Sequence, residues 1–194
     1  MFHSQAERHA FKGKKWKDGI VPYTIGSGFS SDEQAIIARS IQEFERKTCI
    51  RFVPRKKKHR DYVSIQVMKN DECGEADVCR IGGKQFVKLG RDCVDMNTVV
   101  HELGHTVCMA HEHRRHDRDK YITLTAESDK NDPNNKKAKW DHTTLGLMYD
   151  YESVMHYECP HFFKPTSGAV KNCSGDELSV LDAEKINAFY RCGG

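Results

Sequence analysis

The sequence predicts an α+β fold, because helical and strand-like hydrophobic patterns occur together along its 194 residues. Some segments repeat apolar residues every three or four positions, which is typical of an amphipathic helix. Others alternate apolar and polar residues, which is typical of a strand with one buried face. Between them, residues 129–142 are polar and rich in Asn, Lys and Pro, and we expect a long surface loop there.

The first helix is the best marked of the expected elements. Ser30 and Glu33 have the spacing of a capping box, in which each side chain bonds the other residue's backbone N–H. The apolar residues that follow share one helical face and predict a helix over residues 31–48: Ile37, Ile41 and Phe44.

The remaining elements follow from the same two patterns. Alternation predicts three strands, Ile50–Val53, Tyr62–Val67 and Gln85–Leu89, and the segment Ile20–Ile25 is also expected to be a strand. The segment Thr98–Val107 has helical spacing. Ser179 and Asp182 offer a second capping box, which predicts a short terminal helix reaching Tyr190.

Composition excludes several classes of protein. Hydrophobic residues make up 38% of the chain and charged residues 30%, as in an ordinary globular domain. No apolar run approaches the ~18 residues that a membrane span needs. The formal charge of +3 is too small to indicate a nucleic-acid partner. The basic run 55–60 is expected to be a solvated turn between two strands, with contact to a polyanion as the alternative.

The cysteines indicate an oxidising compartment. Eight are dispersed along the chain without a CxxC pair, which argues against a zinc ribbon or a thioredoxin-like site. An even, dispersed set favours disulfides and a secreted protein. Because no signal peptide is visible at Met1, we expect that a secretory segment and a pro-segment precede this chain.

The segment HELGHTVCMAH, which begins at His101, has the spacing of a zinc site. On a helix His101 and His105 share one face and can both bind one ion. Because His111 comes six residues after His105, the chain must turn sharply near residue 108 to bring it back. A catalytic zinc site leaves one position open for water.

This arrangement predicts hydrolytic chemistry. One Zn²⁺ per chain would activate water, and Glu102 would take its proton and pass it to the leaving amine. A bare HExxH is a weak signal, and the third histidine makes it strong. Most other histidines are expected to be exposed or locally hydrogen-bonded, namely His3, His9, His59, His113, His116, His142 and His161, and His156 is expected to be structural.

With these motifs the chain resembles the astacin family of metzincin zinc proteases. The run EHRRHDRD after His111 is similar to the segment that follows the third ligand in that family, and WKDGIVPY from Trp16 is similar to the start of its catalytic domains. The segment SVMHY from Ser153 resembles its Met-turn. The resemblance extends over nearly the whole chain.

The resemblance implies a zincin-like domain of two lobes with a cleft between them. Residues 9–107 would form an N-terminal lobe, with a twisted sheet edged by antiparallel pairing and two long helices. Residues 108–194 would form an irregular lobe with a terminal helix. Residues 1–8 would be a pro-segment remnant or an extension.

The resemblance also implies roles for single residues. Met155 would lie beneath the metal, and Tyr157 would be both a zinc ligand and a catalytic residue that swings away to stabilise the transition state. Glu112 would be the buried acid that meets the mature N-terminus. The segment from Gly82 to Leu89 would be the rim strand that pairs with substrate. Lys164 and Lys171 could favour an acidic substrate residue, or could simply be exposed.

The family's disulfides carry over as Cys49–Cys192 and Cys73–Cys93. Cys79 and Cys108 stand where the family usually has glycine, and we hypothesise that they are joined to each other, with two independent buried thiols as the alternative. Cys159 and Cys173 would then close a loop beyond the Met-turn.

We therefore expect a secreted, monomeric zinc endopeptidase that cleaves internal bonds of proteins or peptides, with no nucleic-acid partner and no membrane span. One alternative is a zinc-bearing binding protein that lost catalysis through Cys108. Another is a nucleic-acid binder that uses residues 55–60, although that run lacks interleaved aromatic residues.

Overall fold

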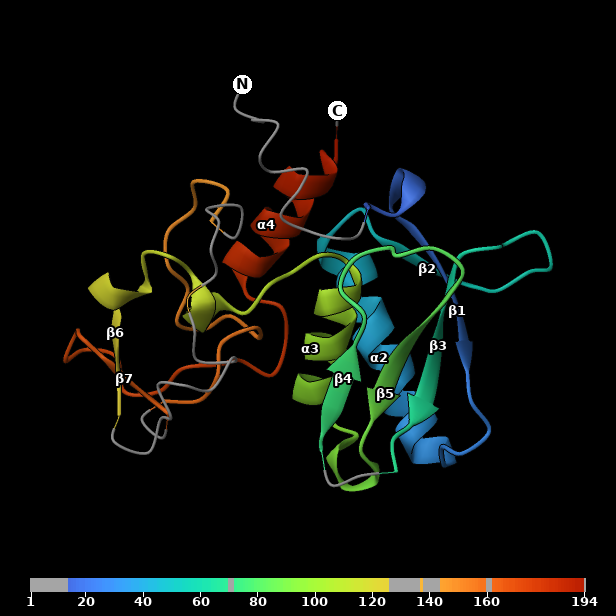
Figure 1. Cartoon of the computed structure of the whole chain (residues 1–194), viewed down its shortest axis with the longest axis horizontal. Helices are drawn as coiled ribbons and strands as arrows, with labels where there is room; N and C mark the ends of the chain where they lie inside the picture. Colours follow the sequence, from blue (N-terminus) through green and yellow to red (C-terminus); the bar gives the residue numbers. More distant parts are fainter. Residues whose placement is uncertain (1–13, 70–71, 126–136, 138–143, 160–161, 194) are drawn as a thin grey trace.

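The computed structural model describes residues 14–69, 72–125, 137, 144–159 and 162–193. The expected extension 1–8 lies outside the described residues, and so does nearly all of the loop expected at 129–142. Figure 1 shows two lobes, with the sheet and two helices on one side and the C-terminal part of the chain on the other. The α+β architecture expected from the sequence is confirmed.

Five strands form the sheet of the N-terminal lobe. They are β1 (Ile20–Ile25), β2 (Arg51–Pro54), β3 (Tyr62–Val67), β4 (Gly74–Ala76) and β5 (Lys84–Leu89). Their order is β2-β1-β3-β5-β4. The first four in this order are parallel, and β4 is antiparallel to β5.

The sheet order corrects the expected rim strand. The segment from Gly82 to Leu89 contains β5, which lies inside the sheet between β3 and β4 and has no free edge. The edge nearest the C-terminal lobe is β4, a strand of only three residues. A strand of three residues is too short to show alternation. The regular pattern of β5 was detected instead, and the rim was therefore assigned to the wrong strand.

Two helices cover one face of the sheet (Figure 1), namely α2 (Ser31–Lys47) and α3 (Met96–Thr106). The Ser30 and Glu33 capping box is present at the start of α2. Helix α3 begins two residues before the expected position, because the Asp95 side chain accepts a hydrogen bond from the Thr98 N–H. Apolar side chains of both helices and of the sheet form the main core.

The C-terminal lobe has little regular structure among its described residues. Its elements are the hairpin strands β6 (Ile122–Leu124) and β7 (Phe163–Pro165), the helix α4 (Val180–Tyr190), and 3-10 turns at Glu112–Arg114 and Arg118–Lys120. Two further 3-10 turns, Lys17–Gly19 and Arg91–Cys93, lie in the N-terminal lobe. Over the described ranges, we find no helix that combines the length and apolarity of a bilayer span.

Four disulfides cross-link the chain. They are Cys49–Cys192, Cys73–Cys93, Cys79–Cys108 and Cys159–Cys173, the same pairs as those expected from the sequence. The first joins the end of α2 to the end of the chain, and the third joins the two lobes beside the histidine motif.

Candidate metal centre and active site

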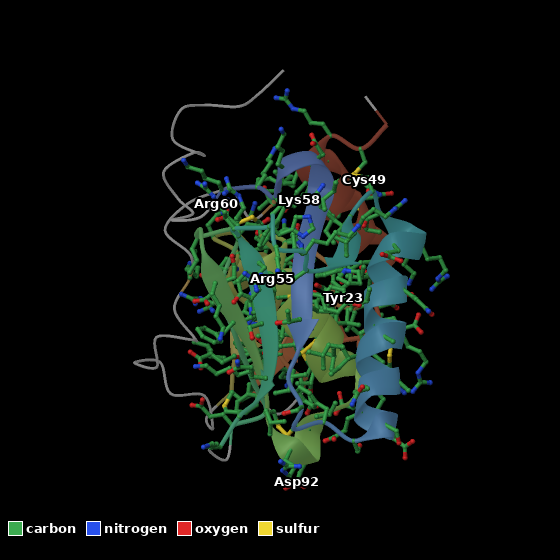
Figure 2. All side chains as sticks on the ribbon, turned by 90° about the vertical axis from the view of Figure 1, so that its right-hand side faces the viewer. Tyr23, Cys49, Arg55, Lys58, Arg60 and Asp92 are labelled. Atoms are coloured by element: carbon green, nitrogen blue, oxygen red, sulfur yellow. A yellow bond between two sulfur atoms is a disulfide. The ribbon has the colours of Figure 1, made fainter. Side chains whose placement is uncertain are left out.

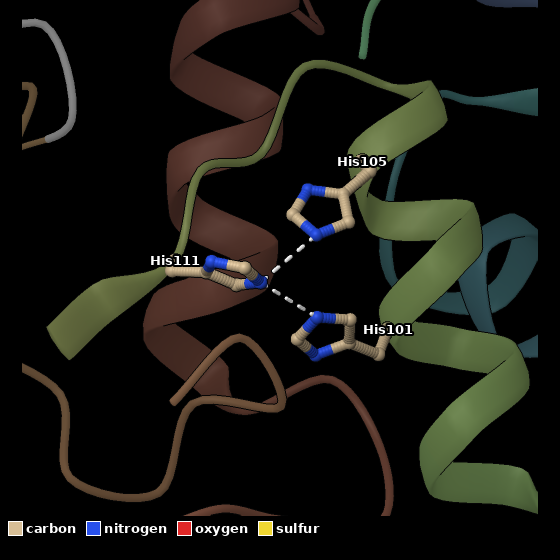
Figure 3. A group of neighbouring side chains, drawn as sticks. All are labelled: His101, His105 and His111. Atoms are coloured by element: carbon tan, nitrogen blue, oxygen red, sulfur yellow. Dashed lines mark hydrogen bonds between the residues drawn. The ribbon is translucent and has the colours of Figure 1, made fainter. Parts of the chain in front are cut away.

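Helix α3 places two histidines of the motif on one face. His101 and His105 are one helical turn apart, so both side chains point away from the core toward the C-terminal lobe (Figure 3). The opposite face of the helix is anchored by Val99, Val100 and Leu103, which are fully buried. This packing fixes the rotation of the helix and therefore the direction of both imidazoles.

A tight turn after α3 returns the third histidine to the same place. Cys108 has φ +77°, which ends the helix in the left-handed conformation. The Met109 N–H then donates to the Gly104 carbonyl at 2.9 Å. The reversal leads directly to His111, as the sequence required near residue 108.

The three imidazoles converge on one point (Figure 3). The Nε2 atom of His111 lies 3.0 Å from Nε2 of His101 and 3.1 Å from Nε2 of His105. Zinc–nitrogen bonds of about 2.0–2.1 Å in a tetrahedral site imply nitrogen separations of roughly 3.3 Å. The three nitrogens therefore have nearly the spacing that a tetrahedral ion requires, and these residues form a candidate metal site.

Hydrogen bonds to backbone carbonyls orient two of the rings. His101 Nδ1 donates to the Val154 carbonyl at 2.8 Å, and His105 Nδ1 donates to the Met109 carbonyl at 2.9 Å. With the proton on Nδ1, the Nε2 lone pair is available to a metal. Burial lowers the pKa of all three histidines, that of His105 to about 3, so the rings are neutral and can act as ligands.

Glu102 lies next to the histidines as a buried acid. Its side chain is 6% exposed, and its Oε2 has no hydrogen-bond partner among the described residues. Burial, with a smaller contribution from Glu75, raises the pKa of Glu102 to about 8. A divalent cation nearby would oppose this shift and favour the carboxylate. A buried acid without a partner is costly unless water or an ion completes its environment.

Gly74 of the edge strand β4 is the neighbour that makes room for Glu102. A Cβ atom at this glycine would lie 2.8 Å from Glu102 Cγ and Cδ, closer than real Cβ contacts. This role could not be predicted from the sequence, because Gly74 becomes adjacent to α3 only once β4 pairs with β5. The carboxylate therefore lies beneath the rim of the sheet.

The predicted Met-turn supports the histidines from below. Met155 is fully buried, and a Cβ atom at Gly104 would lie 2.7 Å from its sulfur, so the turn and α3 approach closely because residue 104 is a glycine. The turn is fixed by Asp182 of α4, whose carboxylate accepts from Ser153 Oγ at 2.6 Å and from the Val154 N–H at 2.9 Å.

Tyr157 follows the turn and lies beside the ligands. The centroid of its ring is 4.9 Å from that of His111 and 4.1 Å from that of His113. His113 was expected to be exposed or locally hydrogen-bonded. It is fully buried between these rings and Phe163, and its Nδ1 accepts a hydrogen bond from the Tyr157 N–H at 3.3 Å. His156, for which a structural role was expected, is buried, with Nε2 2.7 Å from the Tyr149 hydroxyl.

Glu112 is held by cations of its own chain. Its carboxylate contacts Lys185 Nζ of α4 at 2.5 Å and Arg115 Nη1 at 3.0 Å, and it accepts from the Asp150 N–H at 2.9 Å. The Glu112 N–H donates to the Met155 carbonyl at 3.0 Å, which links the acid to the Met-turn. Because residues 1–13 lie outside the described residues, contact between Glu112 and the mature N-terminus stays a prediction.

Cys79 and Cys108 both have positive φ, at 61° and 77°. The Cys79 N–H donates to the His105 carbonyl at 3.0 Å, so the segment after β4 is attached to the end of α3 by a hydrogen bond as well as by the disulfide. The sulfur of Cys108 is therefore bonded to Cys79 and is not available as a metal ligand.

A hollow of about 770 Å³ opens near the start of α3, one turn before His101. Four of its lining side chains are acidic, namely Asp95, Glu158, Asp176 and Glu177, and Asn97 and Asn172 contribute to the rest. Neither Lys164 nor Lys171 lines it, so their suggested role in selecting an acidic residue finds no support in this hollow.

Comparison with known proteins agrees with this geometry. The family model for Astacin, a peptidase family, matches residues 8–191. The chain belongs to the astacin family. A curated relative, zinc metalloproteinase nas-8 of Steinernema carpocapsae, is 40% identical over 192 residues, covering 92% of this chain and 45% of the relative. Its counterpart in Caenorhabditis elegans is 36% identical, with 92% and 47% covered. This astacin-family chain thus spans about half the length of these relatives.

Solved structures agree with the fold of this astacin-family chain. High choriolytic enzyme 1, a hatching enzyme zinc-protease from Oryzias latipes, superposes with a TM-score of 0.80 at 30% identity, covering 99% of this chain and 98% of that one. Myroilysin superposes with a TM-score of 0.62 at 20% identity, covering 91% and 95%, which supports the fold alone.

Proposed function

We propose that this chain is the catalytic domain of a secreted, monomeric zinc endopeptidase that cleaves internal peptide bonds of proteins. The observation that carries the proposal is the convergence of three neutral imidazole nitrogens beside the buried acid Glu102, one of whose oxygens has no partner among the described residues. Family membership and the names of the relatives indicate that the metal is zinc. The four disulfides support secretion.

His101, His105 and His111 would hold one zinc ion, with Tyr157 as a further ligand. Bound zinc supplies a Lewis acid that polarises a substrate carbonyl and lowers the pKa of water. The backbone carbonyls of Val154 and Met109 keep the two helical histidines in the ligating tautomer during turnover.

Glu102 is proposed as the general base and then the general acid. Its carboxylate takes the proton of the attacking water, and the same oxygen later gives a proton to the leaving amine. Tyr157, whose ring lies beside that of His111, would donate a hydrogen bond to the substrate oxygen as negative charge develops on it. The edge of β4 above Glu102 would pair with an extended substrate backbone, because an edge strand has unpaired N–H and C=O groups.

The structure offers no observation, within its described residues, that favours a purely binding role. That alternative rested on damage caused by Cys108, but the turn at Cys108 adopts the left-handed conformation and still brings His111 to the other ligands. A free thiolate near the metal is also absent from the described part of the chain, where no cysteine is free.

The test compares the zinc-loaded wild type with Glu102→Gln and, as a matched control, Glu184→Gln on the exposed side of α4. We expect Glu102→Gln to retain zinc and to lose about 10²- to 10⁴-fold in the rate of protein cleavage. The control should cleave at the wild-type rate. Cleavage by Glu102→Gln at the wild-type rate, with zinc bound, would show that another group is the base. A folded, zinc-containing wild type that cleaves nothing would favour the binding role.

A further inference from the structure

The run Arg55-Lys56-Lys57-Lys58-His59-Arg60 forms a loop between β2 and β3, here called the basic loop. It carries five of the formal positive charges of a chain whose net charge is only +3, so the rest of the chain is net −2. Strand β2 is the sheet edge opposite β4, and the basic loop therefore lies away from the metal site. Figure 2 shows Arg55, Lys58 and Arg60 on the side of the sheet far from the C-terminal lobe.

The basic loop is an ordered turn. The His59 N–H donates to the Lys56 carbonyl at 2.9 Å, and the Lys56 N–H donates to His59 Nδ1 at 3.1 Å. The guanidinium of Arg55 lies 3.8 Å above the centroid of the Tyr62 ring. These contacts fix the backbone of the turn and the Arg55 guanidinium, which reduces the backbone entropy that a ligand must remove on binding.

The described carboxylates do not balance the charges of the basic loop. Within the described ranges, none of its residues has a carboxylate within ion-pair distance. The adjacent acid, Asp61, is bound to Arg80 and accepts from the Gly83 N–H at 2.8 Å. Lys56, Lys57 and Lys58 are all exposed. The loop therefore presents a concentrated positive charge to solvent.

We propose that the basic loop is a binding site for a sulfated polysaccharide. Lysine ammonium groups are compact point charges that suit sulfates spaced along a flexible chain. Binding of a single-stranded nucleic acid requires exposed aromatic rings on which bases stack. The loop contains no Phe, Trp or Tyr, and Arg55 covers the ring of the neighbouring Tyr62. Binding to a membrane surface requires large apolar side chains that insert into it, and the loop has none of these. The disulfides favour an extracellular polyanion.

The test measures binding of the zinc-loaded chain to heparin, used as the sulfated probe. The loop variant is Lys56→Ala/Lys57→Ala/Lys58→Ala. The matched control removes three exposed cations elsewhere, Lys17→Ala/Arg39→Ala/Lys69→Ala. We expect the loop variant to bind at least about tenfold more weakly near 0.15 M salt, and the slope of log K against log salt to become shallower by about three. The control should stay within about threefold of wild type.

Further measurements separate this inference from a general charge effect and from the proposed protease activity. Hydrolysis of a short peptide should be the same for wild type and loop variant, which also shows that the variant is folded. Equal weakening in both triple variants would overturn the proposal, because binding would then follow net charge alone. It would equally be overturned by tight binding to desulfated heparin, or by tighter binding to duplex DNA or phosphatidylserine vesicles.

Discussion

At the scale of single residues, two glycines set the distances inside the site. Gly104 lets the Met155 sulfur approach α3, and Gly74 leaves the volume that the Glu102 carboxylate occupies. Neither carries chemistry, and neither has a local sequence signal. Their importance depends on contacts between segments far apart in the chain.

The close contact at Gly74 predicts the effect of one added methyl group. In Gly74→Ala the new Cβ would overlap Glu102, and the flexible side chain would move before the packed strand and helix do. We expect the rate of peptide hydrolysis to fall at least about tenfold, because proton transfer needs the carboxylate at hydrogen-bond distance from its partner. Zinc content and unfolding temperature should change little.

Gly168→Ala is the control for this substitution, since a Cβ atom there meets nothing within 4 Å. It should leave hydrolysis unchanged. If Gly74→Ala were as active as Gly168→Ala, the position of Glu102 beneath the rim would not matter for catalysis.

Cys79 and Cys108 lose stability through their strained backbone conformation and gain stability through their disulfide. A left-handed φ costs about 1 kcal/mol or more at each non-glycine residue. A disulfide across a separation of 29 residues stabilises by about 3.6 kcal/mol in the chain-entropy account. The gain exceeds the cost, which explains how two cysteines can occupy positions that favour glycine.

This balance predicts an order of stability in urea unfolding. The wild type should be the most stable, Cys79→Gly/Cys108→Gly should follow, and Cys79→Ala/Cys108→Ala should be the least stable. The glycine pair loses the disulfide, but glycine adopts positive φ without strain. Glycine also has the larger entropy in the unfolded chain, which offsets part of this gain. We therefore expect the free energy of unfolding of the glycine pair to exceed that of the alanine pair by about 1 kcal/mol. An alanine pair as stable as the glycine pair would show that positive φ carries no cost here.

At the scale of elements, the sequence predicted those with a long or capped pattern. Helix α2 was expected at residues 31–48 and lies at Ser31–Lys47, and β3 has the expected bounds. The three-residue strands β4, β6 and β7 were missed, because strands this short are defined by their partners. The mistaken rim strand has the same cause.

Helix α4 connects to the metal site through one buried acid. Asp182 caps its own helix at Ser179 and also fixes the Met-turn, which in turn accepts the hydrogen bond from His101. Burial raises the pKa of Asp182 to about 6. In the unfolded chain this pKa is about 3.9, so the folded protein binds a proton more tightly.

The sign of this shift gives a prediction for stability against pH. Between pH 4 and 6 the folded state holds more protons at this site than the unfolded state, so the free energy of unfolding from this group falls as pH rises. The difference between the folded and unfolded pKa of Asp182 corresponds to a change of roughly 3 kcal/mol in the free energy of unfolding. In Asp182→Asn, the free energy of unfolding measured in urea should therefore fall less between pH 4 and 6 than it does in the wild type.

Asparagine can keep the contacts of Asp182, with its oxygen accepting from the Val154 N–H and its amide donating to Ser153 Oγ. Glu184→Gln, on the exposed side of the same helix, is the control and should follow the wild-type pH dependence. An unchanged pH dependence in Asp182→Asn would show that Asp182 titrates alike in both states.

At the scale of the whole molecule, the zinc motif and the Met-turn could be predicted from the sequence, but the packing of the C-terminal lobe around them could not. The spacing of His101, His105 and His111 indicates one ion because helical geometry is local. The burial of His113 and the contact of Lys185 with Glu112 arise from the packing of the C-terminal lobe, where few patterns are regular. These contacts could be found only once the packing of the C-terminal lobe is known.

The Cys49–Cys192 disulfide acts at this largest scale, because it spans 143 residues. In the chain-entropy account a loop of this length stabilises by roughly 5 kcal/mol, against about 3 kcal/mol for the pair Cys159 and Cys173, whose sequence separation is 14. In urea unfolding we therefore expect Cys49→Ala/Cys192→Ala to lose more stability than Cys159→Ala/Cys173→Ala. Hydrogen bonds between Asn187 and the end of α2 remain in the first variant, so it should still fold. An equal or smaller loss would show that these contacts already constrain the ends of the chain.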